Sequence, residues 1–433
     1  MTGQRLITRA FLMIDLKALI RQNRSGSRVG IPCFCSANEL VIRAILGHAA
    51  HHEVPVVIEA TCNQVNQAGG YTGMTPAGFI GWVRQLADAA GLAEGRIIFG
   101  GDHLGPNPWR REPAAIAMQK AEILVRQYVE AGFQKIHLDA SMCCADDDSL
   151  SFEAIARRAA ALCAVAERAA PDPTRLVYII GTEVPVPGGE TTEPDALEVT
   201  SVARFRNTLE THRAAFAEQG LDAAWRRVVG VVTQPGVDFG HSSVFNFRPE
   251  ASRTLSDAIL DEPELVFEAH STDYQPTAAL EALVAQHFFF LKVGPELTFR
   301  MREAVFALAA IEDSLAPTKP SGLVAVLEQA MTRNDAHWRD YYSGNPQEVR
   351  LLKEYSYSDR IRYYWTEPAV RQALVQLLDN LRTLEVPQTC ISRHFGALEF
   401  GDMPQVPDVL LERHIGKAIA RYYQAAGLPG CRG

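Results

Sequence analysis

Five polar residues with possible acid–base or metal chemistry stand at the ends of apolar stretches. Asp102 and His103 follow one such stretch, Glu183 ends another, His241 lies in the loop after a third, and His270 ends a fourth. Three neutral imidazoles suit a divalent transition metal, most plainly Zn²⁺, and a carboxylate can complete or exchange within that ligand shell. Such a metal polarises a carbonyl during carbon–carbon cleavage. Asp102 could then exchange a proton with the hydroxyl of the carbon that is cleaved.

A plainer interpretation stays open for each of these residues. Asp102 could cap a turn and His103 could be a surface residue, because rim histidines are common in α/β proteins. His137 stands inside an apolar stretch, which is typical of a buried core histidine rather than a ligand. The remaining grouped histidines lie near an expected helix end and are assigned to solvent: His48, His51 and His52.

Alternating apolar and amphipathic stretches predict the elements that position these residues. The expected strands are 31–35, 54–60, 96–101, 135–140, 175–183, 227–233, 265–270 and 288–293. The expected helices are 38–51, 75–90, 113–131, 149–170, 195–219, 249–260, 276–286 and 298–310. Nearly wholly apolar strands indicate a parallel sheet buried on both faces. Eight such units predict a (β/α)₈ TIM barrel with its site at the carboxyl ends of the strands. An open doubly wound sheet is the alternative, but no Gly-rich phosphate fingerprint follows the first strand.

Two extensions flank the expected barrel. A helical segment precedes the first strand, so residues 1–316 are expected to form the barrel domain with an N-terminal extension. Residues 317–433 are expected to form an aromatic-rich helical extension that packs on the barrel, because no Pro/Gly/Ser linker separates them. An arginine from 358–362 could lie on its surface or reach the barrel mouth and meet an anion.

Composition limits the classes of partner. The 433 residues are 47% hydrophobic and 21% charged, which is typical of a globular protein. The formal net charge of −9 argues against a nucleic acid or an anionic membrane as partner. No apolar stretch reaches the roughly 18 residues of a membrane span, and the first residues do not resemble a secretory signal. The eight cysteines lack zinc or disulfide spacing, so reduced thiols in the cytoplasm are expected.

Four long stretches carry a resemblance to a known family. They are 57–74 (VIEATCNQVNQAGGYTGM), 100–109 (GGDHLGPNPW), 136–142 (IHLDASM) and 356–365 (SYSDRIRYYW). In them the chain resembles the Z-subunit family of tagatose-1,6-bisphosphate aldolase over essentially its full length. That family is similar to the class II ketose-bisphosphate aldolases, which are zinc-dependent TIM barrels.

The resemblance implies roles for the residues at the strand ends. Asp102 would be the catalytic acid, Glu183 (followed by a Gly-Gly-Glu turn) a catalytic or metal-binding carboxylate, and His103, His241 and His270 the metal ligands. Substrate-binding roles are expected for Glu59, Asn63, Asp139, Asp273, Lys292 and Arg360. One departure concerns the Gly-rich phosphate turn that follows the last histidine in class II aldolases. Asp273 stands there instead and would repel phosphate, which fits a sugar with fewer phosphates or none.

Two functions remain open from the sequence. The first is a metal-dependent lyase or C4-epimerase acting on ketohexoses (tagatose or fructose) or their phosphates, by cleavage between C3 and C4 and re-addition. The second is a non-catalytic subunit that stabilises a catalytic aldolase partner. A homo-oligomer is expected in either case. Tagatose-6-phosphate kinase activity, which has been assigned to some members, is not supported, because the chain has no Walker loop or other kinase signature.

Overall fold

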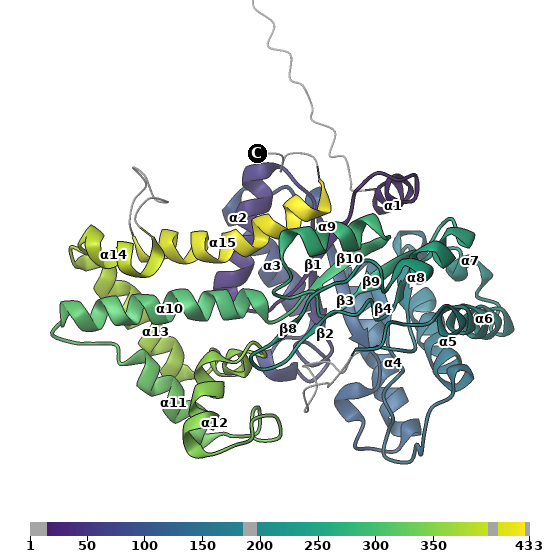
Figure 1. Cartoon of the computed structure of the whole chain (residues 1–433). Coiled ribbons are helices and arrows are strands. Elements are labelled where there is room, and N and C mark those ends of the chain that lie inside the picture. The colour runs from purple at the N-terminus through teal and green to yellow at the C-terminus, as the bar shows by residue number, and fades with distance from the viewer. Residues whose placement is uncertain (1–14, 185–196, 397–405, 429–433) are drawn as a thin grey trace, which may run out of the picture.

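The computed structural model describes residues 15–184, 197–396 and 406–428. Eight parallel strands close into one barrel in the order β1-β10-β9-β6-β5-β4-β3-β2. Their bounds are β1 Ile31–Cys35, β2 Val56–Thr61, β3 Ile97–Leu104, β4 Lys135–Leu138, β5 Val177–Ile180, β6 Val228–Val232, β9 Val266–Ala269 and β10 Phe288–Val293. The predicted TIM barrel is therefore confirmed (Figure 1). Each expected strand overlaps an observed one.

The helices that follow the barrel strands along the chain lie outside the barrel. They are α2 Glu39–His52, α3 Pro76–Ala90, α4 Ala114–Ala131, α5 Phe152–Ala169, α6 Val202–Glu218, α7 Asp222–Trp225, α8 Arg253–Ala258, α9 Thr277–Ala285 and α10 Glu296–Leu315. Local signals explain several boundaries. Thr75 caps α3 through its side chain, Pro76 occupies the first turn, and Gly91 ends the helix in the left-handed conformation.

Strand β3 differs from the expectation in its length. Asp102 and His103 were expected in a loop after the strand, but β3 continues to Leu104 because β2 pairs with it as far as Thr61 opposite Asp102. The pairing with β4 shifts register between Gly101 and Leu104, and His103 has a positive φ of 50°. This irregularity lets both Asp102 and His103 be buried, although consecutive residues of a regular strand face opposite sides.

The connection after β6 contains a feature that the sequence did not predict. Two short strands, β7 Asp238–Phe239 and β8 Val244–Phe245, pair in antiparallel fashion. His241 lies in the turn between them. Its position therefore depends on this hairpin and not on the end of a barrel strand.

The C-terminal helices lie beside the barrel and also cover part of it (Figure 1). They are α11 Leu323–Arg333, α12 Pro346–Tyr355, α13 Pro368–Thr383, α14 Gln388–Phe395 and α15 Pro407–Ala426, with a short 3₁₀ turn, η6 Arg360–Tyr364. The long α10 contacts α11, α13, α14 and α15, while α15 also contacts α2, α9 and β1. Helix α15 thus occupies the outer layer of the barrel between α2 and α9.

Two apolar clusters form the core. The smaller one fills the barrel interior with residues such as Cys33, Val57 and Phe290, and it includes Leu16 and Ile20 of α1 (Leu16–Arg24). The larger one lies between the strands and the helices and continues into α13 and α15. In the part of the chain that the structure describes, no helix is long and apolar enough to cross a membrane.

Candidate metal centre and pocket

Three imidazole rings converge inside the barrel near the carboxyl ends of the strands. His103 comes from β3, His137 from β4, and His270 directly follows β9. Their ring centroids are 5.0 Å (His103–His137), 5.0 Å (His103–His270) and 5.3 Å (His137–His270) apart. The three rings, which we call the histidine triangle, therefore surround a common centre.

Each ring of the histidine triangle is anchored by a carboxylate through one nitrogen. The pairs are His103 Nδ1–Asp139 Oδ2 at 2.8 Å, His137 Nδ1–Asp102 Oδ1 at 2.9 Å and His270 Nε2–Glu268 Oε1 at 2.9 Å. Carboxylates behind histidines fix the ring orientation at metal sites and leave the opposite nitrogen for the ion. The opposite nitrogen of His137, Nε2, is buried and has no hydrogen-bond partner among the described residues.

The donor set fits a transition metal. Asp102 and the histidine triangle each offer a ligand atom, and these atoms all lie within 4.8 Å of one another. Burial lowers the pKa of His270 to about 4, so this ring is neutral at physiological pH, as a ligand must be. Burial also acts to lower the pKa of His103, but the Asp102 and Asp139 carboxylates outweigh it and raise the pKa above its ordinary value. Imidazole nitrogens with one carboxylate are a common zinc donor set.

Below the histidine triangle lies a buried network of alternating charges. Lys135 Nζ lies 2.7 Å from Glu59 Oε1 and 2.5 Å from Glu268 Oε2. Lys292 contacts Glu59 and lies 2.8 Å from Asp102 Oδ1. All five side chains are nearly or fully buried. Buried charges are tolerated only when they are paired in this way, so the network fixes Asp102 and Glu268, which in turn orient two of the three imidazoles.

The network also sets the charge of the two groups nearest the pocket. Burial acts to lower the pKa of Lys292, but Asp102 and the neighbouring acidic groups raise it well above its ordinary value. Burial acts to raise the pKa of Asp102, but His103 and Lys292 hold it well below the usual range. Lys292 is therefore an ammonium and Asp102 a carboxylate at neutral pH.

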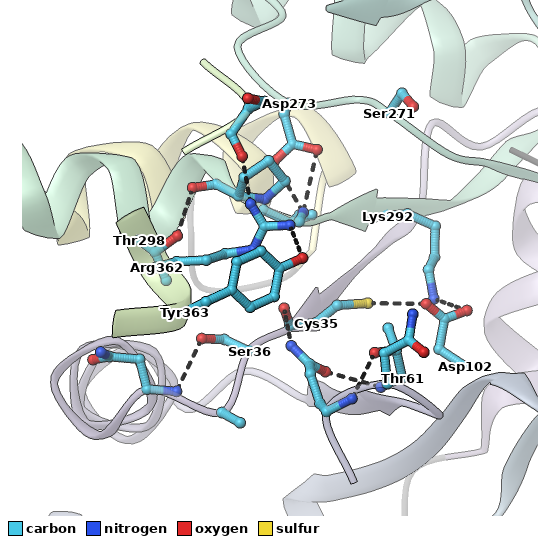
Figure 2. Close-up of a pocket in the computed structure, with 18 of the residues that line it drawn as sticks. Cys35, Ser36, Thr61, Asp102, Ser271, Asp273, Lys292, Thr298, Arg362 and Tyr363 are labelled. Atoms are coloured by element: carbon cyan, nitrogen blue, oxygen red, sulfur yellow. Dashed lines mark hydrogen bonds and ion pairs between the residues drawn. The ribbon is translucent and has the colours of Figure 1, made fainter. Parts of the chain in front are cut away.

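A pocket opens above the histidine triangle, and two parts of the chain line it (Figure 2). The barrel contributes Cys35, Asp102, His103, His270 and Lys292. The C-terminal extension contributes Ser358, Arg362, Tyr363, Trp365 and Thr366. The mouth of a pocket in the barrel is thus completed by residues 65 to 73 positions beyond Val293, the end of the last barrel strand.

The structure does not bring two of the expected metal ligands to this centre. His241 lines the pocket, but its Nε2 lies 3.0 Å from the Tyr341 carbonyl and its ring packs against Tyr342. Glu183 lies beyond the end of β5 and pairs with Arg204. The Gly-Gly-Glu turn that follows Glu183 lies outside the described residues. Their assignments as ligands remain predictions without geometric support.

The expected substrate-binding residues fall into three groups. Asn63, Asp273 and Lys292 line the pocket. Glu59 and Asp139 lie under it, where they hold Lys292 and His103. Arg360 does not line the pocket, because its guanidinium lies 3.2 Å from the centre of the Tyr341 ring. Arg362, two residues later, occupies the pocket wall instead.

His137 belongs to the histidine triangle, but the sequence analysis assigned it to the core and not to the metal ligands. A period-two polar pattern could have indicated its position, since Lys135, His137 and Asp139 alternate with apolar residues. Residues two apart on a strand share a face, so a charged residue on each side of His137 indicates a polar interior and not a core. Glu268 and His270 repeat the pattern on β9.

Comparison with known proteins identifies the relatives of the chain. A protein from Sinorhizobium meliloti 1021, named a probable tagatose 6 phosphate kinase, has a solved structure with 44% sequence identity and a TM-score of 0.84, covering 92% of this chain and 100% of that chain. The YdjI aldolase from Escherichia coli K12 is far more distant, with 11% identity and a TM-score of 0.42 over 84% of this chain and 97% of that chain. The fructose-bisphosphate aldolase from Campylobacter jejuni has 14% identity and a TM-score of 0.41, over 86% and 95%. A family model described as D-tagatose-1,6-bisphosphate aldolase subunit GatZ/KbaZ-like matches residues 16–427. The chain therefore belongs to the GatZ/KbaZ-like family of D-tagatose-1,6-bisphosphate aldolase subunits.

Proposed function

We propose that the chain is a metal-dependent enzyme that cleaves and re-forms a carbon–carbon bond of ketohexoses or their phosphates, as a lyase or a C4-epimerase. The observation that carries the proposal is the histidine triangle, in which each ring is anchored by a carboxylate and the site opens into a pocket. Membership of a sugar-bisphosphate aldolase subunit family supports the substrate class. The seven described cysteines are free, which agrees with the cytoplasm as the expected compartment.

The metal would be held by His103, His137 and His270, with Asp102 within reach of the same centre. A zinc ion bound there would supply a Lewis acid able to polarise the ketose carbonyl. This ligand set differs from the predicted one of His103, His241, His270 and Glu183, and it is supported by ligand atoms of His103, His137 and His270 that lie within 4.8 Å of one another.

Asp102 is the group best placed to move a proton. Its carboxylate is anionic and lies in the pocket lining beside Lys292, so it can accept a proton from a substrate hydroxyl and return it during re-addition. Lys292 orients that carboxylate from 2.8 Å. It does not act as an amine nucleophile, because the surrounding carboxylates keep its nitrogen protonated.

The second candidate is a non-catalytic subunit that stabilises a catalytic aldolase. The family description as an aldolase subunit favours it. The kinase activity in the name of the Sinorhizobium relative is not carried over, because this sequence shows neither a Walker loop nor another kinase signature. Assembly into a homo-oligomer is compatible with either function and remains a proposal.

The two candidates are separated by turnover of the purified chain alone. The zinc-loaded protein is incubated with tagatose, fructose and their phosphates, and aldehyde release and fructose–tagatose interconversion are followed. Asp102→Asn keeps the shape of the side chain but cannot carry the proton, so turnover should fall by about 10²–10⁴-fold. Bound zinc is measured on the same samples. Unchanged turnover in Asp102→Asn would reject the mechanism, and no turnover by the parent chain would favour the non-catalytic subunit.

A further inference from the structure

The N-terminus of α10 is closed by a carboxylate of the protein. Asp273 Oδ1 accepts hydrogen bonds from the backbone N–H groups of Gly294 and Glu296, both at 2.9 Å, and its Oδ2 accepts one from Gly294 at 3.2 Å. These N–H groups follow β10 and open α10, which is where a parallel α/β fold usually binds a phosphate. Because Asp273 already occupies these two groups, a substrate phosphate would have to displace its carboxylate to reach them.

The surroundings of Asp273 disfavour a second anion. Glu296 is fully buried beside it, and Arg421 already pairs with the Glu296 carboxylate at 2.6 Å. Burial, and next the Glu296 charge, raise the pKa of Asp273 to about 7. A phosphate at this end of the pocket would therefore meet Asp273 and Glu296, and among the described residues the cation beside them, Arg421, is already paired with Glu296.

The wall of the pocket that the C-terminal extension supplies carries a positive charge, that of Arg362. Arg362 donates to the Asp359 carbonyl at 3.2 Å and to the Tyr363 hydroxyl at 2.8 Å, and it also contacts the Ser358 carbonyl. Across the described ranges, no carboxylate forms an ion pair with it. The nearest acidic residue in sequence, Asp359, forms an ion pair with Arg302, whose Nε lies 2.9 Å from Asp359 Oδ1.

Only two lysine or arginine side chains occur in the described pocket lining, Lys292 and Arg362. Lys292 is held by Glu59 and Asp102, so its charge is balanced within the protein. Arg362 is the cation whose charge the pocket does not balance, and Figure 2 shows it entering from the extension beside Tyr363. A guanidinium presents a planar fork that matches the oxygens of a phosphate or a carboxylate.

We propose that the site takes a ketohexose with a single anionic group, which Arg362 binds, and that Asp273 excludes a second phosphate. This inference rests on the proposed function for its sugar class. The anionic group can be a phosphate or a carboxylate, since both offer the same pair of oxygens to the guanidinium. Arg362 and Asp273 are specificity residues, and neither takes part in bond cleavage.

The test measures binding, so that it does not depend on turnover. Isothermal titration of the full zinc-loaded chain is performed with a neutral ketohexose, its 6-phosphate, its 1,6-bisphosphate and the analogue with a carboxylate at C6. The 6-phosphate or the C6 carboxylate should bind about 10- to 100-fold more tightly than the neutral sugar, and Arg362→Gln should remove that preference. Arg362→Lys keeps the charge but loses the fork, so it should retain an intermediate preference.

Arg360→Gln is the matched control, because it removes an arginine from the same turn whose guanidinium is stacked on Tyr341. It should keep the preference for the anionic sugar, and the unfolding temperature of each variant reports whether it folds. Asp273→Ala frees the Gly294 and Glu296 N–H groups, so it should reduce the difference in affinity between the bisphosphate and the monophosphate. The inference would be overturned if the parent bound the bisphosphate most tightly of the four ligands. It would also be overturned if Arg360→Gln lost the preference for the anionic sugar while Arg362→Gln kept it. Arg362-dependent binding without any turnover would reject the proposed function and keep this assignment.

Discussion

The floor and the mouth of the pocket are built in different ways. The floor consists of side chains from β2, β3, β4, β9 and β10, and each is held by one or two buried partners of opposite charge or by an imidazole. The mouth consists of loop and extension residues held by aromatic contacts and backbone carbonyls, as for His241 and Arg362. A floor held by buried ion pairs suits chemistry that needs fixed geometry, and a mouth on loops suits recognition of the substrate.

The contribution of the buried charged network to stability can be tested by removing Lys135, which pairs with two of its carboxylates. Lys135→Met should destabilise the protein by about 3–5 kcal/mol, because it leaves Glu59 and Glu268 buried with one cation fewer. Denaturant unfolding measures the loss. Lys120→Met is the control, since Lys120 pairs with Glu112 on the surface at 2.6 Å and should cost about 0–1 kcal/mol. Equal effects of the two substitutions would mean that the floor does not depend on its buried ion pairs.

The extension can be tested at the helix that joins it to the barrel. Ile415 of α15 is fully buried in the larger core cluster, so Ile415→Ala should destabilise the whole chain by about 2–5 kcal/mol in a single transition. Val375→Ala on α13 is the control, because Val375 is 57% exposed. We propose on this basis that residues 317–433 fold together with the barrel. An early, separate unfolding transition in Ile415→Ala would show instead that the extension is an independent unit.

A smaller effect is expected from the ionisation of Asp273, which makes the stability of the protein depend on pH. The pKa of Asp273 is raised to about 7 in the folded protein, so folding is disfavoured by its ionisation. Its contribution to stability is therefore full below the ordinary carboxyl pKa of about 3.9 and is lost as the pH rises through about 7. Asp273→Asn can still accept both N–H groups, so it should raise the unfolding temperature at pH 8 more than at pH 5. An equal shift at both values would show that Asp273 is ionised throughout.

The sequence predicted the barrel because apolar strands and amphipathic helices alternate eight times, and every expected strand is present. It also located Asp102, His103 and His270 at the correct edge of the sheet. It missed His137 because a histidine among apolar residues was assigned to the core without regard to Lys135 and Asp139, two residues on either side. Strand periodicity would have placed all three toward the barrel interior.

The arrangement of the residues at the pocket mouth could not be predicted from local sequence patterns. His241 and Tyr341 are 100 residues apart in sequence, and only the folded β7–β8 hairpin and the extension bring them together. Arg360 and Arg362 differ by two positions in a 3₁₀ turn, so a small change in its start decides which one faces the pocket. The left-handed φ of His103 is likewise set by the pairing of β3 with both neighbours. Such features depend on tertiary context.

Zinc binding by two single variants tests the histidine triangle most directly. The parent chain, His137→Ala and His241→Ala are purified without metal, dialysed against a limiting concentration of zinc and assayed for bound metal, with circular dichroism as a check of folding. We expect about one zinc per chain in the parent and in His241→Ala, because the His241 ring is directed to the Tyr341 carbonyl. His137→Ala should lose zinc, because it removes one of the three converging rings. Loss of zinc in His241→Ala together with full binding in His137→Ala would contradict the site described above.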